Sequence, residues 1–166
     1  TSLRITHALR LNAADIGVIS SAVDTRDLQT RPFRDDPLVL VMPLDHPLAH
    51  SPQLSFSDTL SHDYVGLSAS SALAVYLEEQ ALHVGIRMQV RIRAEGFDGV
   101  MRMVARGAGL GIVPQAALDR WPSAAQVKAQ PLREDWACRH LLLCARAFEP
   151  LPAYATALLS ALTAPV

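Results

Sequence analysis

The chain has 166 residues and a mass of 18.0 kDa, half of its residues are hydrophobic and 19% are charged, which excludes an intrinsically disordered protein. Fifteen Lys and Arg residues are balanced by sixteen Asp and Glu residues, and the resulting formal charge of −1 excludes a basic surface suited to a phosphate backbone. No apolar run is long enough to cross a membrane and the N-terminal residues show no signal-peptide pattern, so we predict a cytoplasmic location.

Helical stripes of apolar residues alternate along the chain with short β-branched runs, a pattern typical of helices packed on a sheet. Between Ser71 and Gly85, for example, Leu73, Tyr76 and Leu77 share one helical face, and the glycine ends the helix. In chain order the predicted elements are a helix over 3–9, strands over 15–20 and 34–43, a loop over 44–53, a helix over 57–60, a strand over 64–67, a helix over 71–84, a strand over 87–94, a helix over 97–104, a strand over 110–114, a helix over 115–120, strands over 127–132 and 136–147, and a helix over 151–162.

Two long strands, at 36–43 and 136–147, are interpreted as crossovers between two lobes. Residues 1–38 and 142–166 then form lobe I, and residues 39–141 form lobe II, which has the size of one small domain. The sequence therefore predicts an α/β fold of two lobes with two crossover strands. A small ligand is expected in the cleft between the lobes.

Both cysteines, Cys138 and Cys144, fall on the predicted strand 136–147. An extended strand would hold them about 20 Å apart, which excludes a disulfide between them. We predict two buried free thiols in a reducing compartment.

The glycine-rich segment GAGLG (107–111) follows a predicted helix and precedes a strand, the reverse of the order in a dinucleotide-binding loop. We interpret its glycines as turn residues that end the helix. Gly66 and Ser68 begin a G-x-S pattern, but Ser70 occupies the position where a nucleophile elbow needs glycine. Neither a nucleotide cofactor nor a serine hydrolase is expected.

Two pairs of polar side chains have a spacing that could indicate chemistry. His46 and His50 are four residues apart, but Pro47 lies between them in a predicted loop, so a helical metal site is not expected. Glu78 and Glu79 are adjacent on a helix and cannot face a common point as a catalytic pair must. We interpret all four as solvated side chains and predict no metal, no cofactor, no catalytic residue and no enzyme activity.

Two predicted helix starts remain as candidates for binding a ligand. The unpaired amides at a helix N-terminus and the positive end of the helix dipole favour an anion, and serine hydroxyls add donors. The first start comprises Ser68, Ala69, Ser70 and Ser71. The second comprises Gly96, Phe97 and Asp98.

Three segments together resemble a known family: AADIGVIS (13–20), DPLVLVMPLDHPLA (36–49) and GFDGVMRMVARGAGLGIVP (96–114). In this order and with these gaps they resemble the effector-binding domain of LysR-type transcriptional regulators, over about residues 3–164. The resemblance implies a periplasmic-binding-protein-like fold of two α/β lobes joined by two crossover strands, with a small-molecule effector in the cleft.

The resemblance also implies roles for particular residues. In that family the loop that opens the first long helix of the second lobe hydrogen-bonds an effector carboxylate, and the loop before the next helix lines the cleft. Carried over, these loops correspond to Ser68, Ala69, Ser70 and Ser71, and to Gly96, Phe97 and Asp98. The family's hinge corresponds to Val41, Met42 and Pro43, and Pro114 ends the strand that faces this hinge.

Family members bind DNA and dimerise through an N-terminal winged helix-turn-helix and a linker helix, and these residues match neither. The family's effector domain also opens with a strand, a helix and a second strand, whereas this sequence begins in the helix that follows, so lobe I is expected to be incomplete. The expected partners are a small-molecule effector, further copies in a homodimer or homotetramer, and DNA only through the missing N-terminal domain.

The sequence thus predicts the sensing domain of a bacterial transcription regulator, which binds a small, anionic organic metabolite and so modulates DNA binding. The alternative is a solute-binding protein of a transport system, which would have the same fold but would be exported. An enzyme on the same scaffold is a third class, and the lack of a nucleophile or acid–base pair opposes it.

Overall fold

The computed structural model describes residues 2–21, 23–51 and 53–164. The chain forms two compact units, Thr1–Asp35 with Arg139–Val166 (unit 1) and Asp36–Cys138 (unit 2). The chain therefore passes from one unit to the other at Asp35–Asp36 and returns at Cys138–Arg139, close to the predicted lobe boundaries after residues 38 and 141. None of the helices in the described residues is long and apolar enough to cross a bilayer.

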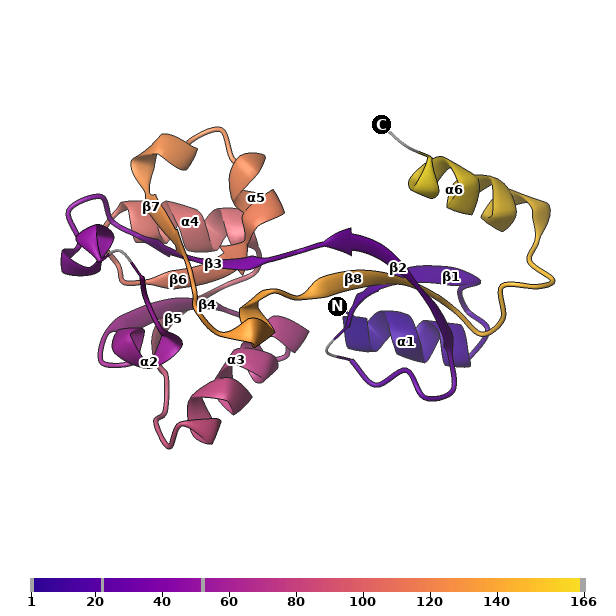
Figure 1. Ribbon diagram of the computed structural model, residues 1–166, viewed down its shortest axis with the longest axis horizontal. Helices are drawn as coiled ribbons and strands as arrows, with labels where there is room; N and C mark the ends of the chain where they lie inside the picture. Colours follow the sequence, from indigo (N-terminus) through magenta and orange to yellow (C-terminus); the bar gives the residue numbers. More distant parts are fainter. Residues whose placement is uncertain (1, 22, 52, 165–166) are drawn as a thin grey trace. The chain divides into compact units, whose positions relative to one another are not determined.

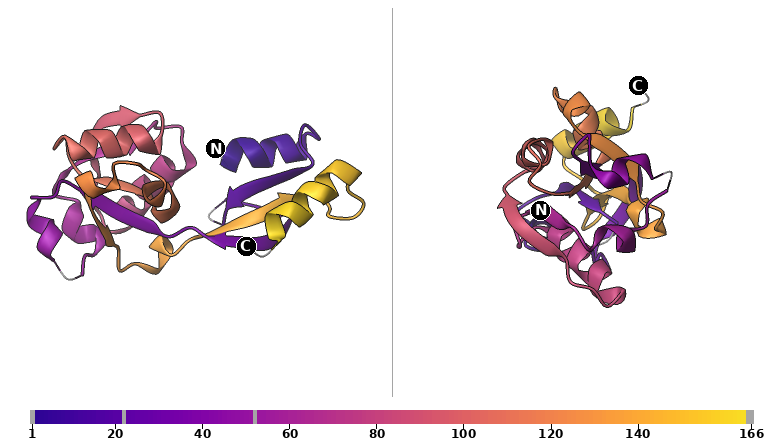
Figure 2. Two further views of the ribbon diagram at one scale, coloured as in Figure 1. Left: turned by 90° about the horizontal axis from the view of Figure 1, so that it is seen from above. Right: turned by 90° about the vertical axis from the view of Figure 1, so that its left-hand side faces the viewer.

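Unit 1 is a three-stranded antiparallel sheet with a helix on each face (Figures 1 and 2). Strand β8 lies at its centre and pairs with β1 on one side and β2 on the other. The elements are α1 (Ser2–Arg10), β1 (Ile16–Ser20), β2 (Gln29–Asp35), β8 (His140–Ala145) and α6 (Ala153–Thr163).

Alternation along β8 explains why both faces of this sheet are covered. Leu143 and Ala145 pack in a cluster with Leu159 of α6, whereas Cys144 packs in a second cluster with Leu9 of α1. Successive side chains of a strand point to opposite faces, so one apolar strand provides the floor for two helices.

Unit 2 is a five-stranded sheet in which four strands are parallel to one another and one is antiparallel. Strands β4 and β5 pair in parallel, β3 pairs antiparallel with both β6 and β7, and a parallel bridge between Tyr64 and Leu110 joins the two groups. The spatial order is therefore β5-β4-β6-β3-β7. The elements are β3 (Leu38–Met42), α2 (Phe56–Thr59), β4 (Asp63–Leu67), α3 (Ala72–His83), β5 (Gln89–Ala94), α4 (Phe97–Ala105), β6 (Gly111–Pro114), α5 (Gln115–Asp119) and β7 (Lys128–Pro131).

The apolar run LVLVM of β3 is buried on both faces, as the pattern of a central strand predicts. Leu38, Leu40 and Met42 pack in the cluster that contains Leu73 and Leu77 of α3. Val39 and Val41 pack in the other cluster, with Val100 and Val104 of α4. Helices α3 and α4 thus cover opposite faces of the sheet, and both start at the ends of parallel strands.

The prediction of one strand over 34–43 was wrong, because two strands occupy this region. Strand β2 ends at Asp35 and β3 begins at Leu38, and Pro37 between them has no N–H for a ladder hydrogen bond. Strand β2 was missed because its sequence QTRPFRD is mostly exposed and includes Pro32, beside which the pairing register shifts. Its identity as a strand depends on pairing with β8, which no local pattern reveals.

The strand predicted over 136–147 is shorter than expected, because β8 begins at His140 and Trp136 lies in a 3₁₀ helix (Asp135–Ala137). Cys138 follows this turn and is exposed, so the prediction of a buried thiol was wrong for Cys138. It is confirmed for Cys144, which is buried in unit 1, and both cysteines are free. The loop predicted over 44–53 contains a 3₁₀ helix at Pro47–His50.

Candidate functional site

The parallel strands of unit 2 bring the predicted binding segments to one edge of the sheet. Leu67 at the end of β4 is in register with Ala94 at the end of β5, and the Tyr64–Leu110 bridge sets β6 parallel to β4. The carboxyl ends of all three strands therefore lie at the same edge. In open α/β sheets, ligands bind in front of this edge, where loops and helix N-termini converge.

The loop of Ser68, Ala69, Ser70 and Ser71 connects β4 to α3 and is held by its own backbone. The N–H of Ser68 donates to the carbonyl of Ala94 at 3.1 Å, and the N–H of Ser71 donates to the carbonyl of Ser68 at 2.9 Å. The hydroxyl of Ser71 caps α3 by accepting from the N–H of Ala74 at 3.0 Å. Ser70 is exposed and its hydroxyl lies 3.2 Å from that of Ser68, so these two hydroxyls are the ones available to a ligand.

The second predicted segment opens α4 directly after β5. Gly96 is the N-cap residue. Because glycine has no side chain to cap the helix, the first amides of α4 have no hydrogen-bond acceptor from Gly96's side and are left open. Phe97 is half-buried and packs against both core clusters of unit 2. Asp98 forms an ion pair with Arg102 one turn later, at 2.7 Å, which offsets the negative charge of its carboxylate.

Pro114 ends β6 at the same edge and stands at the N-cap of α5, but it is buried. The predicted hinge residues lie elsewhere. Val41 pairs with Gly111 at the start of β6, so Val41, Met42 and Pro43 are at the opposite edge. Val41 and Met42 are fully buried in unit 2, and the chain crosses between the units at Asp35–Asp36. A hinge role for Val41, Met42 and Pro43 stays a prediction.

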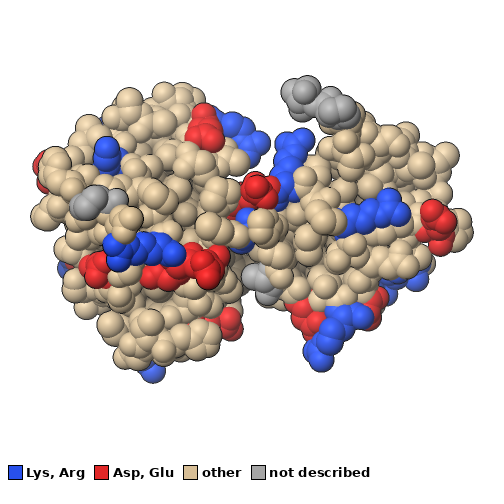
Figure 3. All heavy atoms as spheres, in the orientation of Figure 1, with Lys and Arg blue, Asp and Glu red and all other residues tan. Residues whose placement is uncertain are grey.

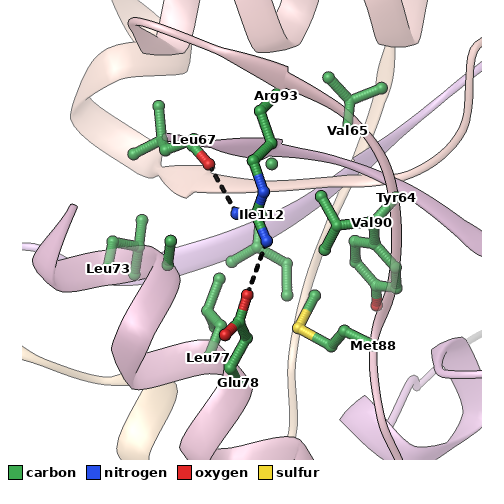
Figure 4. Close-up of a pocket in the computed structure, with 12 residues that line it drawn as sticks. Tyr64, Val65, Leu67, Leu73, Leu77, Glu78, Met88, Val90, Arg93 and Ile112 are labelled. Atoms are coloured by element: carbon green, nitrogen blue, oxygen red, sulfur yellow. Dashed lines mark hydrogen bonds and ion pairs between the residues drawn. The ribbon is translucent and has the colours of Figure 1, made fainter. Parts of the chain in front are cut away.

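Arg93 contributes to this edge and was not among the predicted residues. Its guanidinium donates to the carbonyl of Leu67 at 3.0 Å and to the carboxylate of Glu78 at 2.8 Å (Figure 4). Leu67 immediately precedes the serine loop and Glu78 lies on α3, so one side chain connects β5 to both ends of the segment that carries the serines. Glu78 is exposed, as predicted, and it also forms this ion pair, which the sequence did not indicate.

The cavity beside Arg93 lies between α3 and the β4–β5 pair, and Figure 4 shows its mostly apolar lining. Its volume is about 20 Å³, which is room for roughly one water molecule. We therefore regard it as a packing defect beneath α3 and place the candidate site at the exposed edge above.

His46, which with His50 forms the other pair predicted to be solvated, is held by local contacts. The ring of His46 accepts a hydrogen bond from the N–H of Leu48 at 3.2 Å and lies edge-on to the ring of His62, with 4.9 Å between centroids. Partial burial, followed by the nearby His62, lowers the pKa of His46. Within residues 2–21, 23–51 and 53–164, no group of three or more His, Cys, Asp and Glu side chains is placed to hold a metal ion.

Charged side chains of both signs are interspersed on the face shown in Figure 3, on unit 1 and on unit 2 alike. Fifteen basic and sixteen acidic residues allow no large excess of either sign. The face in view offers no continuous basic stripe that would follow a phosphate backbone.

Residues 1–165 match the model of the LysR substrate binding domain. The chain belongs to this family. Its relatives include the HTH-type transcriptional regulator CysL of Bacillus subtilis, 27% identical over 114 residues, which are 69% of this chain and 38% of CysL. The HTH-type transcriptional regulator CatR of Pseudomonas putida is 28% identical over 116 residues, 69% of this chain and 40% of CatR. The chain thus matches about two fifths of the length of these curated relatives.

Solved structures of regulatory and effector-binding domains have the same fold. The regulatory domain of CcmR from Synechocystis PCC6803, in complex with 2-PG, has a TM-score of 0.86 at 20% identity, covering 98% of this chain and 78% of that one. The effector-binding domain of QuiR in complex with shikimate has a TM-score of 0.77 at 20% identity, covering 96% of this LysR-type chain and 75% of QuiR. The predicted family and its periplasmic-binding-protein-like α/β fold are confirmed.

Proposed function

We propose that this LysR-type domain senses a small organic anion and reports its presence to a DNA-binding part of the same regulator. The observation that carries the proposal is the family match over residues 1–165. Relatives are transcriptional regulators, and structural neighbours were solved as effector domains with small molecules bound. Such a protein works in the cytoplasm, acts without catalysis and reaches DNA only through another domain.

The ligand class follows from the chemistry of the carboxyl edge of unit 2. Two helix N-termini open there, and their free amides favour a negatively charged group. The hydroxyls of Ser68 and Ser70 add donors, while the one acidic side chain among the predicted residues, Asp98, is offset by Arg102. Shikimate and benzoate, the molecules bound by the QuiR and BenM effector domains, are both carboxylates. A carboxylate of similar size is the proposed effector, and Gly96, Phe97 and Pro114 shape the edge around it.

The response follows from linkage between binding and conformation. A ligand that contacts one arrangement of the two units better than another shifts the population toward it. The two covalent passages between the units, at Asp35–Asp36 and Cys138–Arg139, transmit that shift along the chain. In a homodimer or homotetramer, the shift changes how the DNA-binding domains are presented. The predicted cleft between the units stays a prediction.

The test is calorimetric titration of the domain with a panel of carboxylates that includes shikimate and benzoate. For a carboxylate that binds, Ser70→Ala is expected to raise the dissociation constant about fivefold or more, because one hydrogen bond to a charged group is lost. Ser61→Ala is the matched control, because Ser61 is exposed and precedes β4 at the opposite edge of the sheet. Equal affinities for the two variants and the unmodified domain would remove the serine loop from the site.

A further inference from the structure

The outgoing passage of the chain, at Asp35–Asp36, enters unit 2 directly through its sheet. The carbonyl of Pro37 accepts the N–H of Gln115 at 2.8 Å. Leu38 then begins the central strand β3 in register with Pro114. A strand that is paired on both sides and buried on both faces is hard to displace, so the outgoing passage is fixed to the sheet.

The return passage, at Cys138–Arg139, leaves unit 2 from outside the sheet. The residues before it form the 3₁₀ helix Asp135–Ala137, which is a single turn and has few hydrogen bonds of its own. Ala137 is 2% exposed and packs in the core cluster that contains Leu73 and Leu77 of α3. Side-chain contacts with the helices therefore set the point from which the chain leaves unit 2.

Trp136 makes the most extensive of these contacts, with one aromatic ring from each of two helices. Its ring lies edge-to-face against Phe56 of α2, with 5.1 Å between centroids and 81° between planes. It lies in the same way against Tyr76 of α3, at 5.9 Å and 79°. Edge-to-face geometry is favourable for aromatic rings. A carboxylate oxygen of Glu134 also accepts the N–H of Phe56 at 2.7 Å, so the turn is fastened to both helices just before the return passage.

Helix α3 connects this aromatic contact to the serine loop (Ser68–Ser71). Ser71 is the N-cap of α3, and Tyr76 follows five residues later, about 7.5 Å along the helix axis. An α-helix is stiff over this length, so a displacement of its first turn also displaces the ring of Tyr76. A continuous series of packed groups thus extends from the serine loop through Tyr76 and Trp136 to Cys138–Arg139, and such series can carry coupling between sites.

We propose that Trp136 is the positioning residue that couples the serine loop to the return passage, while the outgoing passage stays fixed. The inference rests on the proposed function, because a ligand at the serine loop is what changes α3. A ligand that orders the loop and the first turn of α3 holds the ring of Tyr76, and with it Trp136, more firmly. The residues at the return passage then open less often, and unit 1 receives the signal there.

The first test needs no ligand and measures amide hydrogen exchange by NMR. The N–H of Cys138 donates to the carbonyl of Asp135 at 3.0 Å and closes the turn that carries Trp136, so its exchange rate reports whether the turn is held. Tyr76→Ala is expected to speed this exchange about fivefold, although Tyr76 lies on another element. Val75→Ala is the matched control, because Val75 is the exposed neighbour on α3, and it should leave the rate unchanged.

Variants of Trp136 itself separate positioning from general stability. Trp136→Leu should speed the exchange of the Cys138 amide at least as much as Tyr76→Ala does, whereas Trp136→Phe keeps an aromatic ring and should restore most of the protection. The amides of β3 should exchange as before, because only the turn is released. Equal rates in Tyr76→Ala and Val75→Ala, or an equal rise at the amides of β3, would overturn the inference.

The second test adds benzoate or shikimate as the probe and follows the amide signals of Arg139 and His140. In the unmodified domain these signals should shift with the same dissociation constant as those of the serine loop. In Trp136→Leu the shifts should lose more than half of their size, with a dissociation constant within about twofold of the original. Trp121→Phe is the control, because Trp121 packs in the other core cluster of unit 2, and it should keep the full shifts.

The outcomes distinguish this inference from the proposed function. Binding of a probe with undiminished shifts of Arg139 and His140 in Trp136→Leu would overturn the coupling role and leave the proposed function standing. Failure of both probes to bind would count against the proposed function, and the exchange rates of the Cys138 amide would still decide whether Trp136 and Tyr76 hold the return passage.

Discussion

Arg93 and Glu78 form an ion pair of 2.8 Å, although one lies on strand β5 and the other on helix α3, fifteen positions earlier in the chain. The same guanidinium holds the carbonyl of Leu67, the residue before the serine loop. Both side chains are more than a third exposed, so water screens the pair and its free energy is small. Its main consequence is geometric, because it ties the start of the loop to the helix that follows.

Removing this connection is expected to loosen the serine loop more than it destabilises the domain. Arg93→Ala should lower the free energy of unfolding by about 1 kcal/mol or less, but it should lower the affinity for a carboxylate severalfold. Urea unfolding and calorimetry measure the two effects. Arg91→Ala is the control, because Arg91 pairs with Asp63 at the amino end of β4, also at 2.8 Å, and its loss should leave affinity unchanged. Unchanged affinity in Arg93→Ala would show that the pair does not position the loop.

Gly109 is expected to tolerate no side chain. Its φ is +141°, and an added Cβ would lie 2.5 Å from the carbonyl oxygen of Asp63, the same oxygen that accepts the N–H of Leu110. Gly109→Ala should therefore lower the free energy of unfolding by about 2 kcal/mol or more. Gly85→Ala, at φ +76° with open space around it, should cost only about 1 kcal/mol. Equal costs for both changes would contradict the close approach between β4 and the turn before β6.

Tyr64 should make the domain less stable in alkali. It is 1% exposed, and its hydroxyl shares a buried hydrogen bond with Thr59. Burial raises the pKa of Tyr64 above its ordinary value of about 10, and the hydrogen bond between Tyr64 and Thr59 opposes that shift. The native state thus retains the phenol proton that the unfolded chain releases, so this contribution is complete below pH 10 and is lost as the pH rises further.

Urea unfolding at a series of pH values from about 8 to 11 measures this loss, and the free energy of unfolding should fall more steeply in the unmodified domain than in Tyr64→Phe. At neutral pH the substitution should cost about 1 kcal/mol, because the hydroxyl of Thr59 still donates to the carbonyl of Phe56 at 2.6 Å. Parallel curves for the two proteins would show that Tyr64 does not ionise on unfolding.

The two cysteines should differ in reactivity. Cys138 is exposed, whereas Cys144 is buried between β8 and α1, and burial raises the pKa of its thiol despite the opposing charge of Arg10. Thiolate is the reactive form, so a disulfide reagent such as Ellman's reagent should label Cys138 rapidly in the native domain and Cys144 only after unfolding in urea. The Cys138→Ser variant should show no rapid phase. A rapid phase that persists in it would mean that Cys144 is accessible.

Periodicity and glycine placement predicted most of unit 2, because its elements carry strong local signals. The stripe of Leu73 and Leu77, the buried run of β3 and the stop at Gly85 each indicate structure within a few residues. The two helix starts at the carboxyl edge could likewise be located before the sheet was known.

What the sequence concealed depends on contacts between distant segments. Strand β2 is exposed along most of its length and exists through its pairing with β8, more than a hundred residues later. The Arg93–Glu78 pair has no local signature, and Glu78 beside Glu79 resembles any solvated helix face.

The proposed carboxylate site is the edge of unit 2 where α3 and α4 begin. The most direct measurement is a set of amide NMR spectra of the domain during titration with the tightest carboxylate of the panel. The largest shifts are expected at Ser68–Ser71 and Gly96–Asp98, and they should be smaller in Ser70→Ala. Saturable binding whose shifts leave both segments unchanged would contradict it.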